Sequence, residues 1–332
     1  MRFRPLALLL FALTIAGPAA ALPPAPPETI GRLLGQYGAA DGVLTIYEDG
    51  GRLFADGPGV HAKPVVPTPG GGSAVELDGG QTVALDFEMR GGVASAVTVA
   101  GARLPRHDFG AEAVAAIQAK VKADPARVRA EALAASPPVE TGKRPADLVA
   151  LTTIDPRIRL DIRYATANNL MGFPLYERAD AYMQRPAAGA LGRAQKALAA
   201  QGYGLLVHDA YRPWFVTKMF WDATPPEDHV FVADPAEGSK HNRGCAADLT
   251  LYDLKTGKPV EMTGRYDEMS TRSYADFLGG TSRQRALRQI LRTAMEAEGF
   301  TVYPQEWWHF DYKDWPQYGI GTATFTELAA RR

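Results

Sequence analysis

The chain has little of what several protein classes require. Only one of its 332 residues is a cysteine, Cys245, so no internal disulfide can form, and stability has to come from a packed core or a bound metal. Lysine and arginine (36) are balanced by aspartate and glutamate (37), and this balance argues against nucleic acid as the main partner. No apolar run reaches the roughly 20 residues of a membrane-spanning helix. What remains is a globular protein with one large domain or two moderate ones.

The first 21 residues have the three parts of an export signal. Arg2 and Arg4 form a short basic region, an apolar stretch follows at 6–15, and Ala19-Ala20-Ala21 is a small-residue cleavage site. We expect a signal peptide at 1–21, export to the periplasm or the medium, and no stable membrane insertion after cleavage. An uncleaved anchor is the alternative, which the short apolar stretch disfavours.

Residues 28–108 are expected to form a small all-β domain. Apolar and polar residues alternate in short runs, as at 83–89, and glycine pairs such as Gly50-Gly51 separate the runs. Period-two runs broken by residues that accept positive φ indicate hairpins. His61 and His107 are isolated, which favours surface or turn positions over metal binding. The role of this domain stays open.

Residues 109–145 are expected to form a helical linker. Apolar residues recur at helical spacing over 114–121, and Asp124-Pro125 combines a capping residue with a proline suited to the first turn of a second helix.

Residues 146–332 are expected to form an α+β domain of helices and an antiparallel sheet. Helices and strands mix here without regular βαβ alternation. A helix is predicted over 187–201 and a short buried strand over 204–207. Thr281 and Gln284 have the spacing of a capping box that starts another helix.

Two stretches of this domain carry candidate chemistry. His241 and Asp248 flank Gly244 and small residues that permit a tight turn, and a second stretch brings Glu306 and His309 close together. Two histidines and an aspartate would hold zinc with three ligands and leave its fourth position open, as in catalytic sites. Glu306 would supply the free carboxylate that hydrolysis needs.

Residue types alone leave open a second interpretation, in which these histidines bind no metal. A single histidine is more often structural or superficial than a ligand, and spacing cannot by itself bring residue 241 next to residue 309. Positions three apart on a straight strand also face opposite sides. The chain therefore has to bend for Glu306 and His309 to reach one metal.

The arrangement resembles the signature of the bacterial zinc D-Ala-D-Ala metallopeptidases, most closely the VanX-type D-alanyl-D-alanine dipeptidases. The residues that carry the signature are Ser239, His241, Gly244, Ala246 and Asp248, followed by Glu306 and His309. Other stretches typical of that branch are Asp209-Ala210-Tyr211-Arg212-Pro213 and Asp161-Ile162-Arg163-Tyr164. The resemblance covers roughly residues 150–320 and does not extend to the all-β domain.

The resemblance implies one Zn²⁺ per chain and a set of site residues. The implied ligands are His241, Asp248 and His309. Glu306 is implied as general base and acid, and Arg212 as the group that stabilises the oxyanion, for which a fixed, always charged guanidinium is suited. The residues implied or expected to contact substrate or wall its pocket are Tyr164, Ser239, Asp267, Trp307 and Trp308.

The implied activity is zinc-dependent hydrolysis of D-alanyl-D-alanine or a related D,D-dipeptide in cell-wall peptide turnover or recycling. A D,D-carboxypeptidase or endopeptidase that acts on peptidoglycan stem peptides is the first alternative. A zinc-bearing wall-binding module without activity is the second, and a free Glu306 beside an open metal position argues against it. Nothing in the sequence indicates the oligomeric state, and other divalent ions can replace zinc in such a site.

Three further residues have simpler interpretations. Cys245 lies inside the signature but is flanked by small residues, so we expect a packed, unreactive thiol. His208 falls in an apolar strand and is expected in the core. His229 follows two prolines and is expected in an exposed loop.

Overall fold

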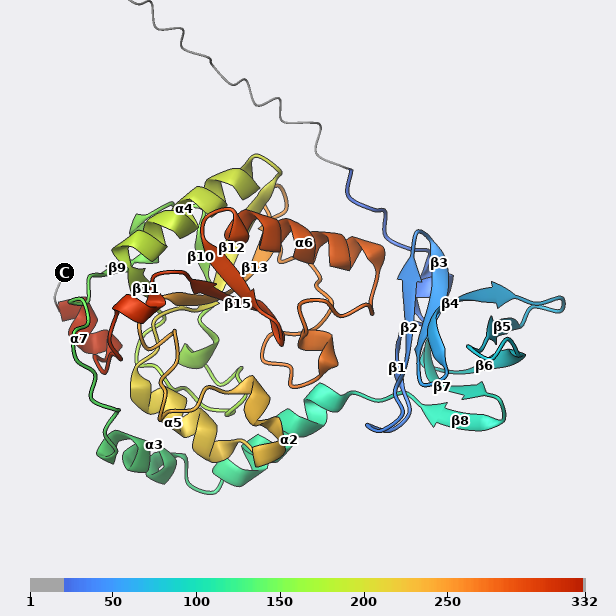
Figure 1. Ribbon diagram of the computed structural model, residues 1–332, viewed down its shortest axis with the longest axis horizontal. Helices are drawn as coiled ribbons and strands as arrows, with labels where there is room; N and C mark the ends of the chain where they lie inside the picture. The colour runs from blue at the N-terminus through green and yellow to red at the C-terminus, as the bar shows by residue number, and fades with distance from the viewer. Residues whose placement is uncertain (1–20, 331–332) are drawn as a thin grey trace, which may run out of the picture.

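A computed structural model of the protein describes residues 21–330, which form two parts joined by a pair of helices (Figure 1). Residues 1–20 of the predicted signal peptide lie outside the described residues. Over residues 21–330, no helix combines the length and the apolar character needed to cross a membrane.

The first part is an eight-stranded antiparallel meander in which each strand pairs with the next along the chain. Glycine turns join the strands, and Gly50 and Gly91 adopt positive φ angles of 55° and 58°. A bridge between Tyr37 and Arg106 connects the first strand to the end of the last, so the sheet curls into a barrel-like form. The expected all-β architecture is therefore confirmed. Its elements are α1 (Glu28–Gly31), β1 (Gly35–Tyr37), β2 (Leu44–Asp49), β3 (Arg52–Gly57), β4 (Val60–Pro67), β5 (Ser73–Glu76), β6 (Thr82–Arg90), β7 (Val93–Val99) and β8 (Ala102–Pro105).

Two helices, α2 (Phe109–Val121) and α3 (Pro125–Ala134), follow the meander. The Asp124 side chain accepts a hydrogen bond from the Arg127 backbone N–H and caps α3, as its position before a proline predicts. Ile117, Val121 and Ala132 are buried in the same hydrophobic cluster as the sheet that follows. The segment predicted as a linker thus joins the two parts and also contributes to the core of the second.

The second part is built on a five-stranded sheet with the order β10-β12-β13-β15-β14. Every pair in it is antiparallel except β10 and β12, which run parallel. The long crossover through β11 and α4 makes this parallel pairing possible, and the expected antiparallel sheet is confirmed for the other three pairs. The strands of this part are β9 (Leu148–Ala150), β10 (Arg159–Leu160), β11 (Tyr182–Gln184), β12 (Tyr203–Asp209), β13 (Ala246–Asp253), β14 (Phe300–Tyr303) and β15 (Glu306–Tyr312).

Helices cover both sides of this sheet (Figure 1). Helices α4 (Arg185–Ala199) and α6 (Ser282–Glu296) lie on one side, and α5 (Trp214–Ala223) lies on the other with α2 and α3. A short helix, α7 (Phe325–Ala330), ends the described chain. This arrangement confirms a mixed helix and sheet architecture.

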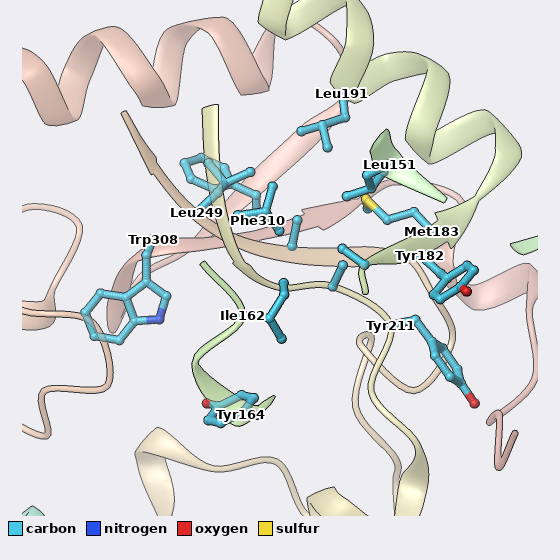
Figure 2. Close-up of a cluster of buried hydrophobic side chains, with 14 of the residues drawn as sticks. Leu151, Ile162, Tyr164, Tyr182, Met183, Leu191, Tyr211, Leu249, Trp308 and Phe310 are labelled. Atoms are coloured by element: carbon cyan, nitrogen blue, oxygen red, sulfur yellow. The ribbon is translucent and has the colours of Figure 1, made fainter. Parts of the chain in front are cut away.

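The main core lies between the sheet and α4 (Figure 2). Leu191 extends from α4 toward Leu249 and Phe310 of the sheet, while Trp308 and Tyr164 lie toward the other side. Full burial of each such side chain stabilises the fold by about 1.5–3 kcal/mol. The two faces of the sheet therefore have separate roles, and the polar site lies on the face turned away from this core.

The predicted start of α6 is present. The Thr281 side chain accepts a hydrogen bond from the Gln284 backbone N–H, and the Gln284 side chain accepts one from the Thr281 backbone N–H. This reciprocal capping box satisfies two of the unpaired N–H groups at the helix start.

Strand β15 contains the bend that the sequence requires. Val302 of β14 pairs with Phe310, but the next residue, Tyr303, pairs with Glu306. Residues 307–309 are left without partners on β14, so the strand bulges there and its side chains are re-aimed.

Candidate metal centre

The register of three adjacent strands brings the candidate ligands together. Asp248 of β13 lies directly opposite His309 of β15 on one side and Asp209 of β12 on the other. Opposite residues of antiparallel strands have Cβ atoms about 4.5–5.5 Å apart on the same face. Gly244, with a φ of 67°, makes the tight turn that connects the loop carrying His241 to β13.

Three ligand atoms form a nearly equilateral triangle. His241 Nε2 lies 3.0 Å from His309 Nδ1 and 3.2 Å from Asp248 Oδ1, and the last two atoms are 3.0 Å apart. In a tetrahedral zinc site with bonds of about 2.1 Å, ligand atoms lie about 3.4 Å from one another. The buried triangle therefore has close to the dimensions that a divalent ion of this kind needs, and it leaves one tetrahedral corner open.

Hydrogen bonds behind the two histidines point their free nitrogens into the triangle. His241 Nδ1 donates to the Ala210 carbonyl at 2.6 Å, which leaves Nε2 with its lone pair. His309 Nε2 lies 2.8 Å from Asp311 Oδ1, which leaves Nδ1 for a metal. Partners of this kind select the tautomer and fix the ring orientation in metal sites.

Asp248 is held in its ionised form. Burial alone would raise its pKa, but His241 and His309 outweigh this effect and keep the pKa well below its usual range. The Tyr266 hydroxyl donates to Asp248 Oδ2 at 3.0 Å, so that Oδ1 is the oxygen turned to the two histidines. An ionised carboxylate with one free oxygen is a suitable third ligand.

Glu306 stands beside the triangle without belonging to it. Its Oε2 lies 3.6 Å from His309 Nδ1, across the bulge in β15. Burial raises the pKa of Glu306 to about 8. A carboxyl group that titrates near neutral pH can both accept and return a proton.

Arg212 follows β12 and lines the same pocket. Its Nε donates to Asp209 Oδ2 at 2.9 Å, and its Nη2 lies 3.6 Å from Asp248 Oδ2. The guanidinium lies over the rings of Phe220 and Tyr164, at 4.9 and 5.3 Å from their centroids. These contacts hold a fixed positive charge next to the triangle.

Asp267 and Tyr164 form a second polar group in the pocket. The Tyr164 hydroxyl donates to Asp267 Oδ1 at 2.9 Å, whereas Asp267 Oδ2 is buried without a hydrogen-bond partner among the described residues. Burial, reinforced by the charge of Asp248, raises the pKa of Asp267 to about 7. An unpaired carboxylate oxygen at this depth is costly unless a ligand pairs with it.

A cavity of about 180 Å³ opens over the triangle. Ser239 lies on its wall, and the Ser239 hydroxyl oxygen accepts the His241 backbone N–H at 3.1 Å, which shapes the ligand loop. The cavity is smaller than the roughly 300 Å³ at which drug-sized ligands begin to fit. The predicted residues that line it are Tyr164, Arg212, Ser239, His241, Asp248, Asp267, Glu306, Trp308 and His309.

Trp307 does not line this cavity, contrary to the expectation that both tryptophans wall the pocket. The bulge turns Trp308 to the metal side, and Trp307 lines a neighbouring cavity of about 610 Å³. The two rings meet edge to face at 5.4 Å. Trp307 therefore lies beside the cavity over the triangle and packs against Trp308, which lines that cavity.

Three residues of the site were given no role by sequence reasoning, although Asp209 belongs to a stretch typical of the family branch. Asp311 orients His309, Tyr266 orients Asp248, and Asp209 pairs with Arg212. The first could have been found, because a residue two positions after a ligand on a strand points to the same face. Tyr266 lies in an irregular loop and left no such signal.

The other singled-out residues behave mostly as expected. Cys245 is buried and unpaired, and burial raises its pKa to about 12, which makes it unreactive. His208 is buried against Tyr266. His229 is half-buried and stacks on Trp221 rather than standing free in solvent, so the expectation of an exposed loop is wrong for its ring.

Comparison with known proteins adds the family. Residues 144–327 match the model of peptidase family M15, described as D-Ala-D-Ala dipeptidase. The chain belongs to this family. Among its relatives, the D-alanyl-D-alanine dipeptidase of Escherichia coli K12 is 35% identical over 165 residues, which are 50% of this chain and 84% of that protein. The D-alanyl-D-alanine dipeptidase of Enterococcus faecium is 36% identical over 177 residues, covering 48% of this chain and 88% of that protein.

Membership of the D-Ala-D-Ala dipeptidase family makes the chain a metallopeptidase, in keeping with the buried triangle of ligand atoms. The match begins at residue 144, so the barrel-like sheet and helices α2 and α3 lie outside it.

Proposed function

We propose that this chain is a zinc-dependent dipeptidase that hydrolyses D-alanyl-D-alanine, or a closely related D,D-dipeptide, to free D-amino acids in the turnover of cell-wall peptides. The observation that carries the proposal is the convergence of His241 Nε2, Asp248 Oδ1 and His309 Nδ1 beside the unligated carboxyl group of Glu306. Two imidazoles and one carboxylate match the donor set of catalytic zinc sites. The names of the relatives supply the substrate.

The proposed mechanism divides the work among residues of this chain. When bound, a zinc ion supplies Lewis acidity toward the scissile carbonyl and the attacking water. Glu306 accepts the proton of that water and returns it to the departing amine. Arg212 donates hydrogen bonds to the negative charge that develops on the carbonyl oxygen. Its contact with Asp209 keeps the guanidinium in place throughout.

Recognition of a free amino terminus is proposed for Asp267. Its Oδ2 has no partner among the described residues, and Tyr164 holds the other oxygen, so an ammonium group would complete the unsatisfied carboxylate. The small cavity supports a substrate of dipeptide size. Both features favour a dipeptidase over a carboxypeptidase or endopeptidase, whose substrates have no free amine at this position. Ser239 and Trp308 would contact the remaining parts of the dipeptide.

The test is release of free alanine, resolved into its D and L forms, by the protein from residue 22 onward. Three substrates are compared, each with and without a chelator: D-Ala-D-Ala, L-Ala-L-Ala and an N-acylated D-Ala-D-Ala peptide. We expect release from free D-Ala-D-Ala that the chelator abolishes and added zinc restores. Preference for the acylated peptide would instead indicate a carboxypeptidase. No release from any of the three by the zinc-loaded protein would contradict the proposal and favour a wall-binding role.

We also propose that the protein acts after export, in the periplasm or outside the cell. The support is the sequence of residues 1–21, with its basic start, apolar stretch and small-residue cleavage site. Fractionation of cells with and without this segment tests the proposal. Retention of the full-length chain in the cytoplasm would contradict it.

A further inference from the structure

The segment Met262–Gly280, called here the substrate loop, carries Asp267 and Tyr266 into the site. The short 3-10 turn Thr271–Ser273 is its one regular element. Asp267 has a φ of 59°, in the left-handed region that a residue other than glycine adopts only under strain. A strained residue on an irregular loop keeps its conformation only if the surroundings hold the loop.

Glu48 of the barrel-like sheet holds the end of this loop. Its side chain is almost wholly buried, and its Oε2 accepts the backbone N–H of Ser282, the first residue of α6, at 2.8 Å. The backbone N–H of Glu48 donates to the carbonyl of Gly280 at 3.0 Å. Arg285 of α6 returns two hydrogen bonds, to the Glu48 carbonyl at 2.7 Å and to Asp49 Oδ1 at 2.8 Å. A buried carboxylate at a helix N-terminus makes this a strong attachment.

The middle of the loop is held by Gln36 of β1. Gln36 is buried, and its Nε2 donates to Thr271 Oγ1 at 3.0 Å. Thr271 lies in the 3-10 turn, four residues after Asp267.

Helix α2 holds the part of the loop next to Asp267. Glu268 is buried, and its carboxylate accepts hydrogen bonds from the Arg265 backbone N–H at 2.9 Å and from Ser270 Oγ at 2.7 Å. A methyl group at Gly110 of α2 would lie 2.2 Å from Glu268 Cγ, so glycine is needed for this close approach. Asp108 adds an exposed ion pair with Arg265 at 2.8 Å.

We propose that the N-terminal sheet and α2 act as a clamp that positions the substrate loop, and that Glu48, Gln36 and Gly110 are positioning residues for recognition of the substrate's amino terminus by Asp267. The role of Asp267 rests on the proposed function. The clamp itself rests on contacts between residues 36–110 and the substrate loop with the start of α6. Residues 36–110 lie outside the family match, whereas the loop lies inside it.

The first measurement is steady-state kinetics of the zinc-loaded protein carrying both Glu48→Ala and Gln36→Ala. We expect KM for D-Ala-D-Ala to rise about tenfold, since two buried hydrogen-bonded attachments are lost, with kcat within about twofold. The ratio of kcat/KM for the free dipeptide to that for its N-acetylated form should fall in the same variant. Glu48→Gln, which keeps an oxygen acceptor for the Ser282 N–H, should lie between the wild type and the double variant.

The matched control is Glu88→Ala. Glu88 pairs with Arg103 on the same sheet, at 2.8 Å, and both side chains are exposed. This variant loses an ion pair of the sheet without touching the substrate loop. Its kinetic constants should equal those of the wild type.

Amide hydrogen exchange provides a readout that does not depend on activity. In the double variant, exchange over residues 262–280 should accelerate at least about tenfold, while residues 241–253 stay protected. If the wild type fails to cleave D-Ala-D-Ala but this exchange pattern is found, the result supports the clamp and contradicts the proposed function. Unchanged exchange over 262–280 in the double variant would overturn the clamp. A fall in kcat together with faster exchange along the whole chain would also overturn it, because the substitutions would then have destabilised the entire fold.

Discussion

The two parts of the molecule share exposed ion pairs but differ in how many charged groups they bury. In the barrel-like sheet, Arg103 of β8 pairs with Glu88 of β6, and His61 of β4 pairs with Asp78 in the turn after β5; the side chains of both pairs are exposed. In the peptidase part, carboxyl groups are buried, and the pKa values of Glu306 and Asp267 are raised by that burial. Exposed pairs of this kind contribute little to stability, whereas a buried charge costs free energy unless something pairs with it.

This difference indicates where the chemistry is. A fold keeps unfavourable buried carboxylates where they serve a ligand or a reaction, and perturbed pKa values cluster at such sites. The one strongly buried acid of the sheet, Glu48, lies at the contact with α6 and not on the free face. The comparison therefore predicts that changes to acids of the peptidase site have large effects and that changes to surface acids of the sheet have almost none.

The largest effect is expected for Glu306→Gln. The variant keeps the shape and the hydrogen-bonding capacity of the side chain but cannot accept a proton, so kcat should fall by about 10³-fold. Zinc content should remain at one ion per chain, because Glu306 is not part of the triangle. Turnover is measured as D-alanine release, and metal content by atomic absorption. A rate near that of the wild type would remove Glu306 from the mechanism.

A smaller effect is expected for Asp311→Asn. Asp311 orients His309 from behind, and loss of such a partner weakens metal binding by about 10- to 100-fold. The affinity is measured by competition with a chromophoric chelator. Activity at saturating zinc should largely recover, in contrast to Glu306→Gln. A variant that binds zinc as tightly as the wild type would show that Asp311 does not support the ligand.

Some residues of the site could be predicted from the sequence, whereas others are evident only from the structure. His241, Asp248 and His309 could be predicted as ligands from the resemblance to the family signature, whereas their residue types and spacing alone left a structural interpretation open. A bend between Glu306 and His309 could be predicted, since the two side chains could not otherwise meet. The sequence does not show that the bend is a bulge in which residues 307–309 have no partners on β14. The position of the bulge depends on how β15 pairs with β14, and no local sequence pattern predicts that pairing.

The contacts between distant segments were beyond sequence reasoning for the same reason. Nothing local indicates that Gln36 pairs with Thr271, 235 residues further along the chain. Helical spacing interrupted at Asp124-Pro125 predicts a helical linker over 109–145, whereas the burial of Ile117 and Val121 against the peptidase core depends on the surface on which they pack. Tertiary packing decides such questions.

A pH-dependent effect on stability is expected for Asp267→Asn in the metal-free protein. The folded pKa of Asp267, about 7, is raised above its ordinary value of 3.8 by burial and by Asp248. Between those two values the unfolded chain is ionised while the folded protein holds the proton. The wild type should therefore lose stability relative to the variant as pH rises from about 4 through 7, and the difference should level off above that range.

Thermal unfolding of both proteins at several pH values, with a chelator present, measures this difference. Parallel curves for wild type and variant would show that Asp267 titrates normally. The same change should abolish selectivity for a free amino terminus in the zinc-loaded enzyme, if Asp267 pairs with the substrate ammonium.

The smallest effect is expected for Arg103→Ala in the sheet. Removing this side chain frees the exposed carboxylate of Glu88, which water solvates at once, so no unpaired buried charge is left behind. The melting temperature, kcat and KM should match those of the wild type within experimental error, at both low and high salt. A measurable rise in KM would break the comparison, because it would mean that the free face of the sheet, and not only its contact with the substrate loop, takes part in recognition of the substrate.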